Sequence, residues 1–369
     1  MEVKSLKIFF SKEQKDKILK DVSDIVDSGQ LAAGEYVEKF EKEWSKINNC
    51  NFGCAVSSGG SALDVIFRAL NLEGKEVILP TNTFIATYNS IHFAGAKPVL
   101  ADVSRNNMCL DLENIKKNFN SNTGAVCLVH IGGVITDEIH EIKKFCDDNN
   151  IYLIEDAAHG HGSSFDGKYP GQFGIAAAYS FFSTKTFTSG EGGMVLTNDK
   201  LLDENCRRLR DYGKKSQWES VHTVLSSNYR MSNITASVGL SHISEINDFL
   251  KKRRAIAKIY DENLSQKFER LKVNNLSGWY KYTVYLPKGV DRSEFKEKSK
   301  QKGVGLPGGV YDLPLHLQPV LKDLNLEGKL SIAEDVCSRH ICLPIYPNLD
   351  DKEVEFAYKT LNDLIDSYE

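Results

Sequence analysis

The chain has 369 residues, of which 41% are hydrophobic and 26% charged, and its formal net charge is −4. This composition is typical of globular proteins and excludes a disordered or collagen-like chain. The small negative charge gives no electrostatic reason to expect nucleic acid or an anionic membrane as a partner. Because domains usually hold roughly 100–200 residues, the length favours two domains.

Eight cysteines are scattered along the chain, and no two of them form a C-x-x-C pair. This spread fits a reducing compartment better than a disulfide framework. The N-terminal stretch has no apolar run of signal-peptide length, and no segment approaches the ~20 apolar residues of a membrane span. The sequence therefore predicts a cytoplasmic protein with no membrane partner.

The first predicted elements are two helices within residues 11–49, where apolar residues recur at helical spacing. Short apolar runs then predict seven strands, at 52–57, 76–80, 97–102, 124–130, 151–155, 177–182 and 193–197. Helical patterns lie between them, near 61–71, 84–94, 112–118, 136–149 and 200–210. Continuous apolar strands that alternate with helices indicate a parallel sheet covered on both faces.

The pattern changes from about residue 232. One long helix is predicted over 232–268, and the charged run K-K-R-R at its centre is interpreted as a solvated helix face. The remaining predictions are a strand at 279–286, a helix at 293–302, a loop rich in glycine and proline, and a final helix at 351–367. These elements indicate a smaller α+β domain, so we divide the chain into domains 1–245 and 246–369.

Residues 151–198 contain the most informative pattern. One predicted strand ends in Glu155-Asp156, and the next is followed by Lys185 and the glycines of G-E-G-G. Ligands of an open α/β sheet bind outside the carboxyl ends of its strands, so the acid and the amine are expected at one edge. Alone, Lys185 is best explained as a surface lysine and Asp156 as a strand-end cap. Their combination with the glycines favours a functional site.

Such a pair is what pyridoxal phosphate (PLP) chemistry needs. A buried carboxylate keeps the pyridine nitrogen protonated, so that the cofactor works as an electron sink. A lysine holds the cofactor as an imine and then serves as general base. A phosphate needs N–H groups and hydroxyls, which Ser61, Gly59 and Gly60 offer before a predicted helix, with Ser180 as a second donor. A plain helix N-cap is the alternative for this segment.

Four other residues have structural explanations as alternatives to a role in the site. Phe84 could be an ordinary core residue. His159 and His161 form an H-x-H pair, but they have no acidic or cysteine partner at ligand spacing, so no metal site is predicted. His130 begins a glycine turn, and a structural role there is as good an explanation as a place in the site.

The sequence resembles the DegT-type sugar aminotransferases, a branch of the fold-type-I PLP enzymes. The resemblance extends over nearly the whole chain and rests on the segments GEYVEKFEKEW (34–44), SSGGSAL (57–63), PTNTFIATYNSIHFAGAKPVLADV (80–103), EDAAHGHG (155–162), SFFSTKTFTSGEGG (180–193), NYRMSNITASVGL (228–240) and LPIYPNLDDKEV (343–354). It implies an α/β fold: an aspartate-aminotransferase-like large domain with a mostly parallel central sheet, plus a smaller α+β C-terminal domain.

The resemblance also implies a role for each site residue. Lys185 would form the Schiff base, Asp156 would pair with the pyridinium nitrogen, and His159 would lie near the ring hydroxyl. Phe84 would stack on the ring of the cofactor. The phosphate would be bound by Gly60, Ser61 and Ser180, and Asn228 would reach the phosphate in the neighbouring subunit. The last role implies a homodimer with shared active sites. The family usually has threonine at the position of Gly60, so one expected phosphate hydroxyl is missing and Ser61 is expected to substitute for it.

The expected activity is that of a PLP-dependent aminotransferase. An amino acid, with glutamate as the expected donor, would give its amino group to the keto group of a sugar, most simply a nucleotide-linked one. A smaller phosphorylated ketone is an alternative acceptor, and the acceptor region is assigned to Tyr88, Tyr311, His316 and the loop 303–317. A sugar dehydratase or other lyase is a second hypothesis, which the retained Lys185 disfavours. A non-catalytic regulator is a third, but no basic DNA-binding segment is present.

Overall fold

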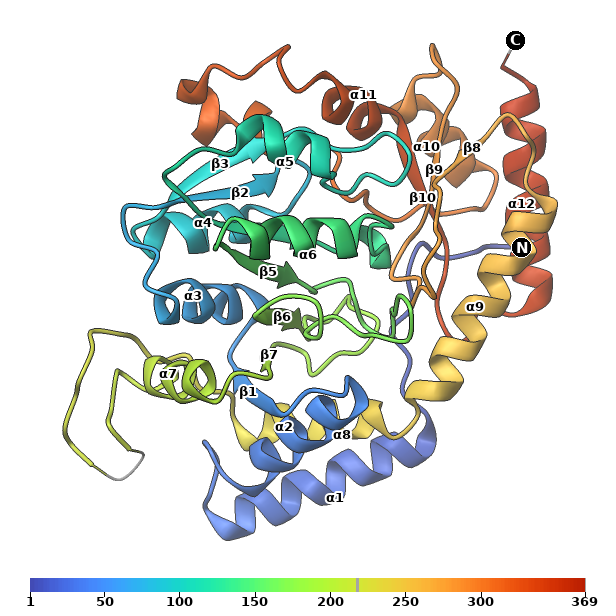
Figure 1. Ribbon diagram of the computed structural model, residues 1–369. Coiled ribbons are helices and arrows are strands. Elements are labelled where there is room, and N and C mark those ends of the chain that lie inside the picture. Colours follow the sequence, from blue (N-terminus) through green and yellow to red (C-terminus); the bar gives the residue numbers. More distant parts are fainter. Residues whose placement is uncertain (217–218, 369) are drawn as a thin grey trace.

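The computed structural model describes residues 1–216 and 219–368 and contains two β-sheets (Figure 1). The larger sheet has seven strands in the order β1-β7-β6-β5-β4-β2-β3. Their bounds are β1 Phe52–Val56, β2 Glu76–Pro80, β3 Lys97–Ala101, β4 Thr123–Val129, β5 Tyr152–Asp156, β6 Ala176–Ser180 and β7 Gly193–Thr197. All seven strands were predicted, because each is a short apolar run, and in all but β3 most of the residues are buried.

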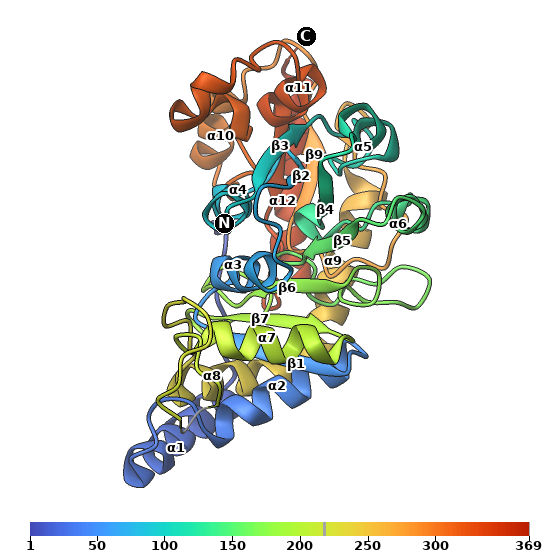
Figure 2. The same ribbon diagram turned by 60° about the vertical axis from the view of Figure 1, so that its left-hand side comes forward.

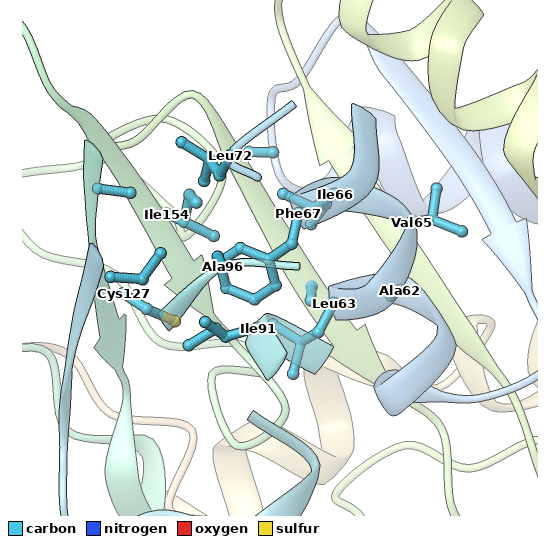
Figure 3. Packing of buried hydrophobic residues seen from close by; sticks show 14 of the residues in the cluster. Ala62, Leu63, Val65, Ile66, Phe67, Leu72, Ile91, Ala96, Cys127 and Ile154 are labelled. Atoms are coloured by element: carbon cyan, nitrogen blue, oxygen red, sulfur yellow. The ribbon is translucent and has the colours of Figure 1, made fainter. Parts of the chain in front are cut away.

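Helices cover both faces of this sheet, as predicted (Figure 2). One face is covered by α3 Gly59–Ala69, α4 Ile85–Phe93 and α7 Lys200–Arg210. The other is covered by α5 Leu112–Asn118, α6 Ile139–Asp148, α2 Glu35–Ile47 and α8 Asn233–Ile243. Figure 3 shows how the first face packs: Leu63 and Phe67 of α3 meet Ile91 of α4, and Cys127 and Ile154 of the sheet lie beneath them. Buried contacts of this kind fix the strand ends in space.

The direction of β7 differs from the prediction of a parallel sheet. This strand runs antiparallel to both of its neighbours, β6 and β1, whereas the other pairs are parallel. The reason lies in the connection from β6 to β7, which contains no helix. A parallel connection usually crosses over through a helix, and the loop 181–192 contains none, so the chain returns antiparallel. The same loop carries Lys185 back over the carboxyl end of β6.

The smaller sheet has the order β10-β9-β8, with β8 Glu269–Arg270, β9 Tyr282–Tyr285 and β10 His340–Leu343. It is accompanied by α10 Arg292–Gln301, α11 Ser331–Arg339 and α12 Asp351–Asp366. The described residues also form short 3₁₀ helices at Ile131–Gly133, Leu315–Leu317 and Pro319–Leu324. The α+β character predicted for this part of the chain is confirmed.

The cores of the two sheets are not divided at a single point of the sequence. Helix α9, Ile246–Asn263, contributes Phe249 and Leu250 to the core beneath α2 and α8, but Ile256 and Tyr260 to the core of the smaller sheet. The N-terminal Val3 also packs into that second core. The division into 1–245 and 246–369 stays a prediction, and these contacts connect its two parts.

The single long helix predicted for 232–268 is wrong. Helix α8 ends at Ile243 and α9 begins at Ile246, so the chain turns at Ser244 and Glu245. The Glu245 carboxylate accepts a hydrogen bond from the hydroxyl of Ser11, the N-cap residue of α1 Lys12–Ser28, at 2.6 Å. This tertiary contact has no signature in the local pattern. Within the described residues, no helix combines the length and the apolar character that crossing a membrane requires.

Candidate functional site

A pocket of about 390 Å³ lies at the carboxyl ends of the large sheet's parallel strands. Six of the eight predicted site residues line it: Gly60, Phe84, Asp156, His159, Ser180 and Lys185. They come from α3, the start of α4, and the ends of β5 and β6, which confirms that the strand-end residues meet at one edge. Ser61 and Asn228 are not among the lining residues.

Asp156 is the last residue of β5 and is buried beneath the pocket. Its carboxylate accepts hydrogen bonds from the Thr87 hydroxyl at 2.8 Å and from the Ala158 backbone N–H at 3.1 Å. Burial raises the pKa of this carboxyl, and the two hydrogen bonds and the positive charge of Lys185 act in the opposite direction. The site therefore keeps a desolvated carboxylate that gains from any cationic group brought into the pocket.

Lys185 lies in the loop between β6 and β7, and its amine reaches the same pocket. Burial lowers the pKa of the amine to about 8, the negative charge of Asp156 raises it, and the positive charge of Lys281 lowers it further. A lysine with such a pKa is partly neutral near pH 8 and can act as a nucleophile or base. The loop thus presents a reactive amine opposite a carboxylate.

The lowered pKa predicts the pH dependence of Lys185 modification in the cofactor-free protein. Reaction with an amine-directed reagent, followed by peptide mass spectrometry, should rise with pH through a midpoint of about 8. The exposed Lys168 is followed in the same samples as a control for the reagent. Asp156→Asn should move the Lys185 midpoint lower, because the carboxylate raises that pKa. A wild-type midpoint above 10 would contradict the described surroundings.

The N-terminus of α3 forms another wall of the pocket. A Cβ atom on Gly59 would lie 2.6 Å from the Ser180 Cβ, so only glycine lets α3 begin this close to the end of β6. The first-turn N–H groups of a helix have no partner within it, and here they face a pocket that also receives the Ser180 side chain. This cradle of N–H groups and hydroxyls fits a phosphate.

Ser61 is placed differently from the prediction. Its hydroxyl lies 3.0 Å from that of Ser57 and 2.9 Å from that of Ser58, and its backbone N–H donates to Ser58. Ser58 is the N-cap residue of α3 and itself lines the pocket. Ser58 was not among the predicted site residues, although a serine before two glycines at a helix start is a recognisable N-cap signal.

Aromatic rings form the remaining walls. His159 stacks on Tyr280 with 4.2 Å between the ring centres, and its Nδ1 accepts the Gly132 N–H at 3.3 Å. Burial holds the pKa of His159 well below its usual value, so the ring is neutral. Phe84 is 56% exposed at the pocket, which makes the core explanation for this residue wrong. Tyr311 lies nearby, with its hydroxyl 3.4 Å from the His159 Nε2.

Asn228 lies outside the pocket of its own chain. It is exposed on the segment that follows α7, where its side chain accepts the Arg230 backbone N–H at 3.1 Å and its backbone bridges to Asp211. Figure 1 shows the described part of this segment reaching out beside α7. Its predicted contact with the phosphate of a neighbouring subunit stays a prediction.

The remaining residues considered in the sequence analysis, His130, His316 and Tyr88, lie outside the pocket lining. His130 lies 2.8 Å from the buried Glu155, which also accepts N–H groups of the 171–174 loop. His316 is held between Thr81 and Glu334 and does not line the pocket, and neither does Tyr88. Among residues 1–216 and 219–368 there is no group of three or more His, Cys, Asp or Glu side chains suited to a metal ion.

Fold and pocket together define an α/β protein of the aspartate-aminotransferase type, with a lysine and an aspartate at the carboxyl edge of its sheet. The sequence model of the DegT/DnrJ/EryC1/StrS aminotransferase family matches residues 12–362. The chain belongs to this family, and it is a transaminase by that membership. Membership also implies a cofactor of the pyridoxal phosphate type.

Individual proteins support the same assignment. The GDP-perosamine synthase of Escherichia coli O157:H7 is 32% identical over 346 residues, which cover 93% of this chain and 94% of that protein. The dTDP-3-amino-3,6-dideoxy-alpha-D-galactopyranose transaminase of Aneurinibacillus thermoaerophilus is 28% identical over 364 residues and 98% of both chains. The structure of Helicobacter pylori PseC, an aminotransferase of pseudaminic acid biosynthesis, superposes over 100% of both chains with a TM-score of 0.92 at 24% identity. That likeness shows a shared fold.

Proposed function

We propose that this chain is a PLP-dependent aminotransferase that moves an amino group from an amino acid, glutamate in the first instance, to the keto group of a nucleotide-linked sugar. The observation that carries the proposal is the pocket that unites the Lys185 amine with the Asp156 carboxylate. The curated relatives support the sugar acceptor, since two of them are named for GDP- and dTDP-linked amino sugars.

The residues of the pocket fit this cofactor. The first turn of α3 and the Ser180 hydroxyl suit its phosphate, Asp156 suits its ring nitrogen, and Phe84 offers an exposed aromatic face for its ring. Bound PLP supplies an electron sink that stabilises negative charge on the carbon that loses a proton. Asp156 favours the protonated ring nitrogen, because a buried carboxylate is stabilised by a nearby positive charge.

Lys185 is the residue placed to move protons. With a pKa of about 8, its amine can accept a proton from the donor carbon and return it to another position of the bound substrate. Neutral His159 holds one wall of the pocket and keeps further positive charge away from Lys185. The aromatic walls exclude water, which strengthens the electrostatic interactions inside.

We further propose that the active unit is a homodimer with shared sites. Asn228 is exposed on a segment that also presents the apolar side chains of Val221, Val224 and Leu225 to solvent, and a second copy of the chain would cover them. Light scattering of the purified protein measures the mass of the assembly.

An absorbance spectrum of the purified protein, before and after glutamate, tests the function. We expect a visible band that depends on Lys185 and that glutamate replaces with near-ultraviolet absorption. GDP- and dTDP-linked keto sugars can then be screened for restoring the visible band. A band that glutamate leaves unchanged would point to another donor or to the lyase hypothesis. No band, even after PLP is added, would contradict the proposal.

Position 60 offers a gain-of-affinity prediction. A Cβ on Gly60 would lie 3.6 Å from the Ala86 Cβ and 3.8 Å from the Ser58 hydroxyl, which are ordinary contacts. Gly60→Thr should therefore fit, add a hydroxyl to the phosphate cradle and lower the Kd for PLP roughly fivefold, the effect of one hydrogen bond. Gly60→Ala is the matched control and should leave the Kd unchanged. Equal Kd values for the two variants would contradict the assignment of this cradle.

A further inference from the structure

The ring of Tyr280 has two lysine amines close to it. The Lys185 Nζ lies 4.9 Å from the ring centre and the Lys281 Nζ lies 5.2 Å from it. Tyr280 itself lines the pocket. Both amines are therefore close to the same pocket-lining ring, although residues 279–286 were predicted only as a strand.

Lys281 is held by a backbone hydrogen bond, and its side chain is partly buried. Its backbone N–H donates to the Gly132 carbonyl at 3.2 Å, which ties this end of the small sheet to the turn after β4. The side chain is half-buried, and burial is the largest cause that lowers the pKa of its amine. The residue thus lies where the segment before β9 meets the turn after β4, next to the pocket-lining Tyr280.

No carboxylate of the described residues pairs with this amine. Within residues 1–216 and 219–368, the Lys281 amine makes no salt bridge and no side-chain hydrogen bond. Two of its charged neighbours, Arg253 and Lys296, are cations, and the nearby acid Asp312 pairs with Arg292 at 3.1 Å. An enclosed cation without a partner costs free energy, so it calls for an anion from outside the chain.

We propose that Lys281 binds an anionic group, a carboxylate or a phosphate, of the substrate that reacts at Lys185. The inference rests on the proposed function and adds a specificity-determining residue to it. Both expected substrates carry such a group, since glutamate has two carboxylates and a nucleotide-linked sugar has phosphates. Because both amines lie close to the Tyr280 ring, an anion bound at Lys281 can belong to the molecule that reacts at Lys185.

Three variants of the cofactor-loaded enzyme separate this role from a packing role. Lys281→Met keeps the length of the side chain and removes its charge, whereas Lys281→Arg keeps the charge. Lys288→Met is the matched control, because Lys288 is an exposed lysine just beyond the same strand. If the side chain only covered Tyr280 with its methylene groups, methionine would serve equally well.

Calorimetric titration with glutarate and with pyrophosphate distinguishes the two sources of the anion, and it does not depend on turnover. We expect Lys281→Met to weaken one of these ligands roughly 10- to 100-fold, as for a lost hydrogen bond to a charged group, and arginine to restore much of the affinity. A loss for glutarate, together with a higher half-saturation for glutamate, assigns the donor carboxylate. A loss for pyrophosphate alone assigns the acceptor phosphate.

Equal affinities of Lys281→Met and Lys288→Met for both ligands would overturn the proposal, and so would a wild-type enzyme that binds neither. Failure of the aminotransferase function would show separately, as a wild-type visible band that no amino acid changes. The Lys185 titration gives an independent check on the position of the amine. Because the Lys281 charge lowers the Lys185 pKa, removing that charge should raise the modification midpoint of Lys185.

Discussion

Lys185→Met should abolish amino transfer and leave the fold intact. The amine is the only lysine lining the described pocket, and its lowered pKa suits it to proton transfer near neutral pH. General acid–base catalysis typically contributes 10²–10⁴-fold, so turnover should fall by roughly that factor or more. The visible band should disappear as well, since methionine cannot bind a carbonyl group.

Stability should respond in the opposite sense to activity. Burial makes the charged amine unfavourable where it lies, so replacing it with an apolar side chain of similar length should leave the thermal midpoint of the cofactor-free protein unchanged or raise it. Differential scanning calorimetry and turnover should be measured on the same samples, with Lys168→Met as an exposed-lysine control. Retained turnover in Lys185→Met would contradict the central role of this lysine.

Local patterns in the sequence predicted the larger sheet well. Its strands are short runs buried on both faces, and such runs are recognisable without any tertiary information. Strand-end logic then brought Asp156 and Lys185 to one edge, as the structure confirms. The family resemblance added Phe84 and His159, which no spacing argument could have placed against the pocket.

Features that depend on distant contacts were not predicted. Helix α11 and strand β10 cover only Ser331–Arg339 and His340–Leu343, and periods so short are ambiguous before their partners are known. Tyr280 is distant in sequence from most of the other lining residues, and the segment just before β9 that carries it is hydrogen-bonded to the turn after β4. The reversed direction of β7 followed from a missing crossover helix, which an apolar run alone does not reveal.

The adjacent acids Glu155 and Asp156 at the end of β5 have different roles, one structural and one in the site. Successive strand side chains point to opposite faces, so these neighbours have different surroundings. Glu155 accepts the N–H groups of Gly171 at 2.9 Å and Gly174 at 2.8 Å, and it meets His130 on its other oxygen. Asp156 instead faces the pocket with Thr87 as its side-chain partner. Exchanging each acid for its amide should therefore give opposite phenotypes.

Asp156→Asn should lower turnover roughly 10²–10³-fold, the usual effect of losing one electrostatic stabiliser in a buried site. Its thermal midpoint without cofactor should stay level or rise, because burial already penalises the carboxylate. Glu155→Gln should have the opposite effects. The amide can no longer accept hydrogen bonds on both sides, which should cost about 1–3 kcal/mol of stability. The spectral change on adding glutamate should remain.

Comparing both amides by calorimetry and by turnover tests the assignment of the two acids together. If Asp156→Asn reacted with glutamate at the wild-type rate, the ring-nitrogen role would be lost, whatever its stability. If both variants lost stability equally and kept their chemistry, the strand end would be structural throughout. Only a loss of chemistry in Asp156→Asn and a loss of stability in Glu155→Gln agree with a sheet edge at which one acid holds the 171–174 loop and its neighbour serves the cofactor.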